Sequence, residues 1–229
     1  MTSRLSPAQV QRALRAAAAA PAGRAAAAPR NAPGAAPAAN QGAARGAGEV
    51  RIIGGQWKRT RLAVPVLPGL RPTPDRVRET LFNWLGQDLT GWRCFDTFAG
   101  TGALGLEAAS RGAASVLLVE QDAALAARLQ QHVQRLQAQA VQVRRGDGLA
   151  QLRQCPAASL DLVFIDPPFG STLFQSALQA AAQALAPQGR IYLEAPQAWD
   201  DAALAPLGLT VLRHLRAGMV HAHLLGRGA

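Results

Sequence analysis

Hydrophobic and polar positions follow two patterns along the chain after residue 91. Short runs rich in valine, leucine, isoleucine and phenylalanine predict buried strands, and longer segments with apolar positions three or four residues apart predict helices. The expected strands lie near 93–96, 115–120, 140–144, 160–165 and 189–195, and the expected helices near 103–111, 122–137, 148–153 and 172–185. Strands that alternate with helices form βαβ units, so the pattern predicts an α/β fold around a mostly parallel sheet.

Two further apolar segments, 208–215 and 218–225, follow with no helix between them. A parallel connection needs about a dozen residues or more, whereas an antiparallel pair can be joined by a short turn. We therefore expect these two segments to form an antiparallel hairpin.

Residues 49–90 predict a smaller region ahead of the sheet, with a β-hairpin and one helix. The segments 50–53 and 57–64 flank Gly54-Gly55, and a glycine pair between two apolar segments is a typical hairpin signal.

The helix of this region is expected to begin at Thr73 and Pro74. Threonine is a common N-cap residue, and proline is favoured at the first helical position. Val77, Leu81 and Leu85 then share one helical stripe, so this helix should pack beside the sheet domain.

Composition separates residues 1–48 from the rest of the 229-residue chain. This segment is dominated by alanine, proline, glycine and arginine, and it contains no acidic residue. It lacks the apolar bulk that packing requires, so we expect a disordered basic tail. The whole chain has a net charge of +10, which is typical of proteins that bind polyanions such as nucleic acid.

Cysteine usage and hydropathy bear on the cellular compartment. Cys94 and Cys155 are too few for a disulfide framework, and no stretch of about 18 apolar residues lacks charge and proline. We therefore expect a cytoplasmic protein without a membrane span, and we expect a monomer.

His221 and His223 alternate along the last apolar segment without an evident third ligand, so we expect no metal site.

The segment 160–169 carries the clearest candidate chemistry. Its apolar residues predict a strand buried on both faces, and Pro167 and Pro168 end that strand directly after Asp166. Open α/β sheets bind ligands at the carboxyl ends of their strands. The Asp166 carboxylate and the Pro167 carbonyl can accept both hydrogens of an exocyclic amine while Phe169 stacks on the base. These three residues are the expected catalytic site. The alternative is that Asp166 only caps the next helix and that the two prolines form a turn.

A glycine-rich loop follows the first strand of the sheet domain. Its spacing, with an acidic residue at the end of the next strand, is typical of dinucleotide-binding loops. The Asp96 carboxylate would repel a pyrophosphate, whereas it would attract the ammonium and sulfonium groups of S-adenosylmethionine. Glu120 is placed to bind ribose hydroxyls, and Asp147 to bind the adenine amine. The expected cofactor-binding residues are Asp96, Phe98, Gly100, Gly102, Glu120 and Asp147.

Basic residues gather on the predicted hairpin and helix around Trp57. Basic side chains interleaved with an aromatic ring are typical of phosphate contact combined with base stacking, although an ordinary solvated surface has the same pattern. The expected RNA-binding residues are Arg51, Lys58, Arg59, Arg61, Arg71 and Arg76, and Arg78 is a further candidate for phosphate contact.

These motifs together resemble the RsmD family of class I S-adenosylmethionine-dependent methyltransferases, which modify the N2 amine of a guanine in small-subunit (16S) ribosomal RNA. The resemblance is carried by Arg51-Ile52-Ile53-Gly54-Gly55, by the segment 71–84, by the glycine loop and by the tetrad Asp166-Pro167-Pro168-Phe169. It implies a Rossmann-like, seven-stranded, mostly parallel sheet with a reversed final hairpin. It also implies an RNA-contacting region at 49–90, a cofactor-binding domain at 91–229, and ribosomal RNA or the assembled small subunit as partner.

Three alternatives stay open on the sequence. An adenine-N6 methyltransferase acting on DNA or RNA would use the same tetrad, and a nicotinamide-dependent oxidoreductase would use a similar glycine loop. A non-catalytic RNA-binding protein could also retain this scaffold. The target nucleotide, and the choice between naked RNA and an assembled particle, do not follow from the sequence.

Overall fold

The computed structural model describes residues 48–65, 73–168 and 170–228, which form one compact unit. The predicted tail at 1–48 lies outside the described residues except for its last position. The strands of the unit are β1 Gly48–Arg51, β2 Arg61–Val64, β3 Arg93–Asp96, β4 Ser115–Glu120, β5 Val141–Arg145, β6 Leu160–Ile165, β7 Leu185–Ala195, β8 Leu209–Ala217 and β9 Val220–Arg227. The helices are α2 Asp75–Leu85, α3 Ala103–Ser110, α4 Ala123–Arg135, α5 Gly148–Leu152, α6 Phe174–Ala184 and α7 Asp201–Leu204, followed by a 3₁₀ turn at Ala205–Leu207.

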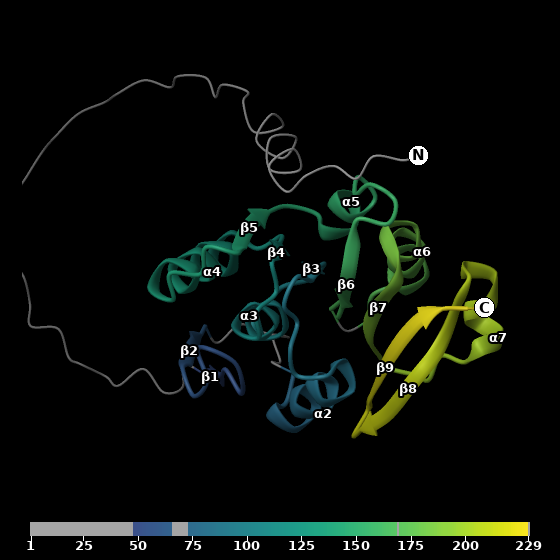
Figure 1. The fold of residues 1–229 in the computed structure, drawn as a ribbon, viewed down its shortest axis with the longest axis horizontal. Helices are drawn as coiled ribbons and strands as arrows, with labels where there is room; N and C mark the ends of the chain where they lie inside the picture. The colour runs from purple at the N-terminus through teal and green to yellow at the C-terminus, as the bar shows by residue number, and fades with distance from the viewer. Residues whose placement is uncertain (1–47, 66–72, 169, 229) are drawn as a thin grey trace, which may run out of the picture. The chain divides into compact units, whose positions relative to one another are not determined.

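A seven-stranded sheet with the order β5-β4-β3-β6-β7-β9-β8 is the centre of the unit (Figure 1). Strands β3 to β7 pair in parallel, whereas β9 pairs antiparallel with both β7 and β8. The predicted α/β fold, with its parallel sheet and reversed C-terminal hairpin, is therefore confirmed. Of the helices in the described ranges, none is long and apolar enough to cross a membrane.

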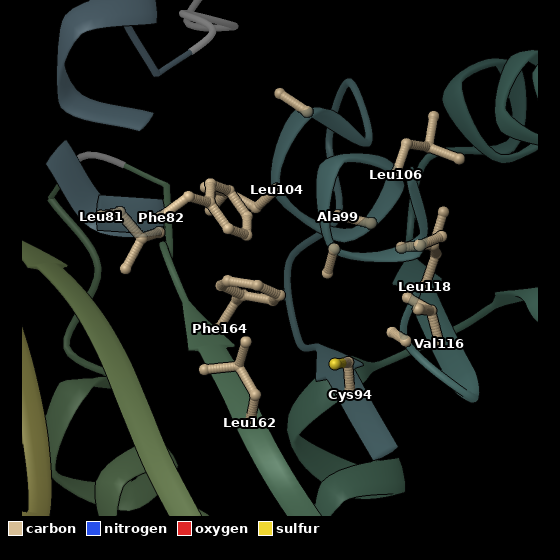
Figure 2. Close-up of a cluster of buried hydrophobic side chains, with 14 of the residues drawn as sticks. Leu81, Phe82, Cys94, Ala99, Leu104, Leu106, Val116, Leu118, Leu162 and Phe164 are labelled. Atoms are coloured by element: carbon tan, nitrogen blue, oxygen red, sulfur yellow. The ribbon is translucent and has the colours of Figure 1, made fainter. Parts of the chain in front are cut away.

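Each central strand contributes to two hydrophobic cores, because successive side chains of a strand point to opposite faces. In β6, Phe164 belongs to the core shared with the β1–β2 hairpin, α2, α3 and α4. Its neighbour Val163 belongs to the core shared with α5 and α6. Figure 2 shows Leu81 and Phe82 of α2 gathered near Phe164, together with Leu104 of α3. The N-terminal helix is thus part of the main core.

One buried carboxylate joins the hairpin, α2 and α3. Glu107 of α3 is fully buried and accepts hydrogen bonds from the backbone N–H groups of Ile53 and Gly54, both at 2.7 Å. Its oxygens also pair with the buried guanidinium groups of Arg111 at 2.8 Å and Arg78 at 3.5 Å. Two cations and two N–H donors therefore compensate the burial of this charge.

The segment that joins the two strands of the hairpin is longer than the predicted tight turn at Gly54-Gly55. Residues 52–60 join β1 to β2, so the glycine pair does not form the whole turn. The glycines instead let this connection approach α3, since a Cβ added to Gly55 would lie 1.9 Å from the carbonyl oxygen of Ser110. Lys58 and Arg59 consequently lie in the connection rather than on a strand face.

The start of α2 also differs from the prediction. Pro74, rather than Thr73, is the residue that caps this helix, and no side chain forms a hydrogen bond to its N-terminus. Arg78 is only 1% exposed and pairs with Asp75 at 2.6 Å in addition to Glu107. The prediction that Arg78 contacts RNA phosphate was therefore wrong, because its guanidinium is used inside the protein.

Replacement of Glu107 by alanine should lower the free energy of unfolding by about 3–5 kcal/mol, because it leaves buried guanidinium groups without their carboxylate. Urea unfolding followed by circular dichroism measures this change. Glu79, an exposed carboxylate on α2, provides the matched control, and Glu79→Ala should change the free energy of unfolding by less than about 0.5 kcal/mol. Equal effects of the two substitutions would contradict the stabilising role of the Glu107 network.

Candidate active site

The strand order places the candidate site at the carboxyl ends of the central strands. Strand β3 lies between β4 and β6, so the chain runs outward through β4 and β5 and then continues on the other side of β3. Ligands of open α/β sheets bind where the order reverses in this way, outside the carboxyl ends of the strands. Asp96 ends β3 in register with Phe164, two residues before Asp166. The two predicted carboxylates thus lie at neighbouring strand ends.

A pocket of about 330 Å³ opens at the end of β6. Its lining includes Asp166 and Pro167 after β6, Glu194 near the end of β7, Thr73 ahead of α2, and residues 217–220 at the β8–β9 turn. The size is sufficient for a small planar group, since ligand pockets start at roughly 300 Å³. The predicted catalytic residues Asp166 and Pro167 therefore share one cavity with a second carboxylate.

The two carboxyl groups in this pocket are strongly perturbed. Burial raises the pKa of Asp166 well above its usual value, and the charges of Glu194 and Asp96 raise it further. Burial also raises the pKa of Glu194, while hydrogen bonds from the hydroxyls of Tyr192 and Thr73 oppose that shift. The Tyr192 hydroxyl donates to Glu194 Oε1 at 2.7 Å. Such a pocket favours a ligand that brings hydrogen-bond donors.

Glu194 and Thr73 are absent from the site predicted from the sequence. Glu194 is 8% exposed and follows the apolar residues of β7, so a lone carboxylate at the end of a buried strand was the available signal. The same signal identified Asp166. Thr73 was interpreted as a helix cap, whereas its hydroxyl contacts the carboxyls of Asp166 and Glu194.

The glycine loop lies between the ends of β3 and β4. Asp96 is buried there and accepts a hydrogen bond from the N–H of Gly105 at 3.1 Å. Burial raises the pKa of Asp96 to about 7, and the charge of Glu120 also raises it. Gly100 and Gly102 have φ angles of +52° and +77°, which glycine adopts readily. The N–H of Gly100 donates to Glu120 at 2.8 Å, so the loop and the second strand end are in contact.

The end of β5 completes the predicted cofactor site. Asp147 is exposed and caps α5 by accepting a hydrogen bond from the N–H of Ala150 at 3.1 Å. Gly148 approaches β3 so closely that an added Cβ would lie 1.7 Å from the carbonyl oxygen of Thr97. The buried Thr97 hydroxyl has no hydrogen-bond partner within the described ranges. Phe98 is half-buried and packs against the core beneath α5 and α6.

These observations fit S-adenosylmethionine. Asp96, Glu120 and Asp147 place carboxylates at three successive strand ends, where they would meet cationic groups, hydroxyls and an amine. A pyrophosphate at the same strand ends would be repelled by these negative charges. The chemistry of the donor set thus favours S-adenosylmethionine over a nicotinamide dinucleotide.

The basic residues predicted to contact RNA remain on the surface where the structure describes them. Arg51 pairs with Asp75 at 3.0 Å and Arg61 pairs with Glu49 at 3.1 Å, in both cases with exposed side chains. The side chains of Lys58, Arg59 and Arg76 are also exposed. Arg71 and Phe169 lie outside the described residues, so their roles stay predictions.

Three histidines stack on the C-terminal hairpin. The ring of His214 lies 5.2 Å from that of His221 and 4.6 Å from that of His223, measured between centroids. His214 was not singled out in the sequence, because its partners come from the neighbouring strand. No group of His, Cys, Asp or Glu in the described part of the chain is arranged to hold a metal ion.

Comparison with known proteins adds an independent observation. Residues 50–226 match the family model described as Conserved hypothetical protein 95. The chain is 40% identical over 186 residues to ribosomal RNA small subunit methyltransferase D of Escherichia coli strain K12, which covers 80% of this chain and 93% of that protein. The protein of the same name from Haemophilus influenzae is 39% identical over 180 residues, which covers 76% of this chain and 91% of that protein.

The solved structures agree with the sequence matches. A putative methyltransferase from Escherichia coli superposes with a TM-score of 0.69 at 36% identity, which covers 80% of this chain and 99% of that chain. The matches span the hairpin, α2 and the whole sheet, which are the regions that carry the predicted motifs. The chain therefore belongs to the Conserved hypothetical protein 95 family, the RsmD family that its sequence resembles.

Proposed function

We propose that this protein transfers a methyl group from S-adenosylmethionine to the exocyclic N2 amine of a guanine in small-subunit ribosomal RNA. The pairing of β3 with β6 carries the proposal, because Asp96 pairs with Phe164, two residues before the Asp166 that lines the pocket together with Pro167. The names of the relatives, ribosomal RNA small subunit methyltransferase D, support an RNA substrate of this kind.

S-Adenosylmethionine supplies an electrophilic methyl group on a sulfonium. Asp96 would attract the positive charge of the cofactor, and the glycine loop would let the cofactor approach the backbone. Glu120 would accept hydrogen bonds from the ribose hydroxyls, and Asp147 from the adenine amine. Each of these residues acts by binding and orienting the cofactor.

The acceptor amine needs activation because the N2 lone pair of guanine is delocalised into the ring. The Asp166 carboxylate and the Pro167 carbonyl would accept its two hydrogens, which favours a more tetrahedral and nucleophilic nitrogen. Orientation of this kind can supply roughly 7–11 kcal/mol toward a displacement reaction. A guanine in a helix must first be flipped out, at a cost of a few kcal/mol that stacking on Phe169 would offset.

Exposed basic side chains would supply the contacts to RNA phosphates. These are Arg51, Lys58, Arg59, Arg61 and Arg76, in an RNA-contacting region at 49–90 ahead of a cofactor-binding domain at 91–229. Arg71, which lies outside the described residues, is assigned to the same contacts on its sequence alone. We place the protein in the cytoplasm, in keeping with its free thiols at Cys94 and Cys155, and we expect it to be a monomer.

Methyl transfer from labelled S-adenosylmethionine to undermethylated small ribosomal subunits and to naked ribosomal RNA tests the proposal. Mass spectrometry of the nucleosides should detect N2-methylguanosine, and the better substrate shows whether the protein acts on RNA or on particles. Detection of N6-methyladenosine instead would move the acceptor to adenine, and absence of transfer to either substrate would refute the proposed reaction.

Replacement of Asp166 by alanine should lower kcat by about a hundredfold or more, because a group that positions the reacting amine is lost. The dissociation constant for S-adenosylmethionine should change by less than about threefold. Single-turnover kinetics and calorimetry measure the two quantities, with Glu79→Ala as the control expected to match the wild type. A loss of cofactor binding in Asp166→Ala would remove Asp166 from the acceptor site.

Cofactor affinity should depend on pH through Asp96. Since burial raises the pKa of this carboxyl to about 7, it is protonated and neutral in more acidic solution and becomes a charged partner for the cofactor as the pH rises. Between about pH 5.5 and pH 7 the dissociation constant for S-adenosylmethionine should fall about tenfold, as measured by calorimetry. Asp96→Asn should bind more weakly at pH 7 and lose most of this dependence. An unchanged pH profile in that variant would assign the titration to another group.

A further inference from the structure

Glu194 is a buried carboxylate to which the proposed reaction assigns no role. It lines the same pocket as Asp166, and its described partners are the hydroxyls of Tyr192 and Thr73. No ion pair formed within the described ranges includes Glu194, whereas the buried Glu107 pairs with two arginines. Buried carboxylates of purely structural function are normally compensated by a cation. This contrast between Glu107 and Glu194 indicates that the Glu194 carboxyl group is available to bind a ligand.

The register of β6 and β7 places Glu194 beside Asp166. Ile165 pairs with Leu193 in the parallel ladder, and the two carboxylates are the residues that follow this pair. Side chains at paired positions of neighbouring strands point to the same face. Tyr192 lies two residues before Glu194 and belongs to the core that includes α2, so Glu194 faces the side of the sheet on which Thr73 precedes α2.

The pocket therefore presents hydrogen-bond acceptors to the base, rather than a combination of donors and acceptors. Asp166, Glu194 and the Pro167 carbonyl can all accept hydrogen bonds, and Glu194 in its ionised form repels a ligand lone pair. Guanine presents N1–H next to its N2 amine, so it brings three hydrogens to one edge. Adenine presents its N6 amine next to N1, which carries a lone pair and would face a carboxylate.

We propose that Glu194 accepts the N1–H of the target guanine while Asp166 and Pro167 hold the N2 amine, so that Glu194 determines the choice of guanine. This inference depends on the proposed function and assigns its specificity to one residue. A site built to bind a hydrogen-bonding group rejects an analogue that lacks the group much more strongly than an apolar pocket does. In its ionised form Glu194 adds a repulsive contribution against adenine.

A base analogue tests the assignment. 2-Aminopurine keeps the amine at position 2, but its N1 carries a lone pair in place of a hydrogen. RNA is prepared with guanosine or with 2-aminopurine at the position that the wild-type enzyme methylates, and kcat/KM is measured for each. The wild type should prefer guanosine by about a hundredfold or more. In Glu194→Gln, the amide can donate to N1 of the analogue, so this preference should shrink at least about tenfold.

The comparison of preferences separates recognition from a general loss of activity. Absence of O6 in 2-aminopurine affects wild type and variant alike, so it cancels when the two preferences are compared. Glu79→Gln should keep the wild-type preference, and cofactor binding verifies that each variant is folded. If Glu194→Gln is unstable, Glu194→Asp is the second variant. Its side chain keeps the carboxylate but is one methylene shorter, so the preference for guanosine over 2-aminopurine should fall in this variant as well.

Two outcomes would overturn the inference in distinguishable ways. If Glu194→Gln lowers kcat/KM for guanosine and 2-aminopurine by the same factor, Glu194 is a structural residue and the proposed methyl transfer stands without it. If the wild type forms no N2-methylguanosine on its RNA substrate, the proposed function fails and the assignment of Glu194 fails with it.

Discussion

The burial of a carboxylate with full compensation is the interaction on which the N-terminal part of this structure depends. Glu107 accepts hydrogen bonds from the connection between β1 and β2 and pairs with Arg78 of α2 and with Arg111, the residue after α3. Each partner comes from a different segment, so the network fixes the hairpin and α2 relative to the sheet. The position of Thr73, directly ahead of α2, follows from this attachment, and Thr73 in turn contacts both carboxyls of the pocket.

The pocket uses the opposite electrostatic arrangement. Asp166 and Glu194 are close to each other, and their described partners are hydroxyl groups rather than cations. An uncompensated pair of carboxyl groups costs stability, as their raised pKa values indicate. Among structural residues such a cost is usually avoided, whereas at functional sites it is common. The difference between Glu107 and Glu194 thus separates a stabilising carboxylate from one that is available to a ligand.

The sequence predicted those features whose signals are local. Apolar runs identified the strands from β3 to β9, and a carboxylate at a strand end identified Asp96 and Asp166. The role of Glu107 escaped prediction because its partners Ile53 and Gly54 lie more than fifty positions earlier in the chain. The glycine pair was misinterpreted for a related reason, since a tight turn and a close approach to another helix require the same residue.

The sheet register also explains how one fold can bring a methyl donor and an acceptor together. The proposed cofactor loop follows β3 and the proposed acceptor residues Asp166 and Pro167 follow β6, and these strands are neighbours whose pairing places Asp96 opposite Phe164. The distance between the two binding sites is therefore set by backbone hydrogen bonds in the centre of the sheet, which are among the least deformable contacts in a protein. In-line transfer requires alignment within a fraction of an ångström. In the proposed reaction, a site divided between two paired strands would obtain this alignment from the sheet itself.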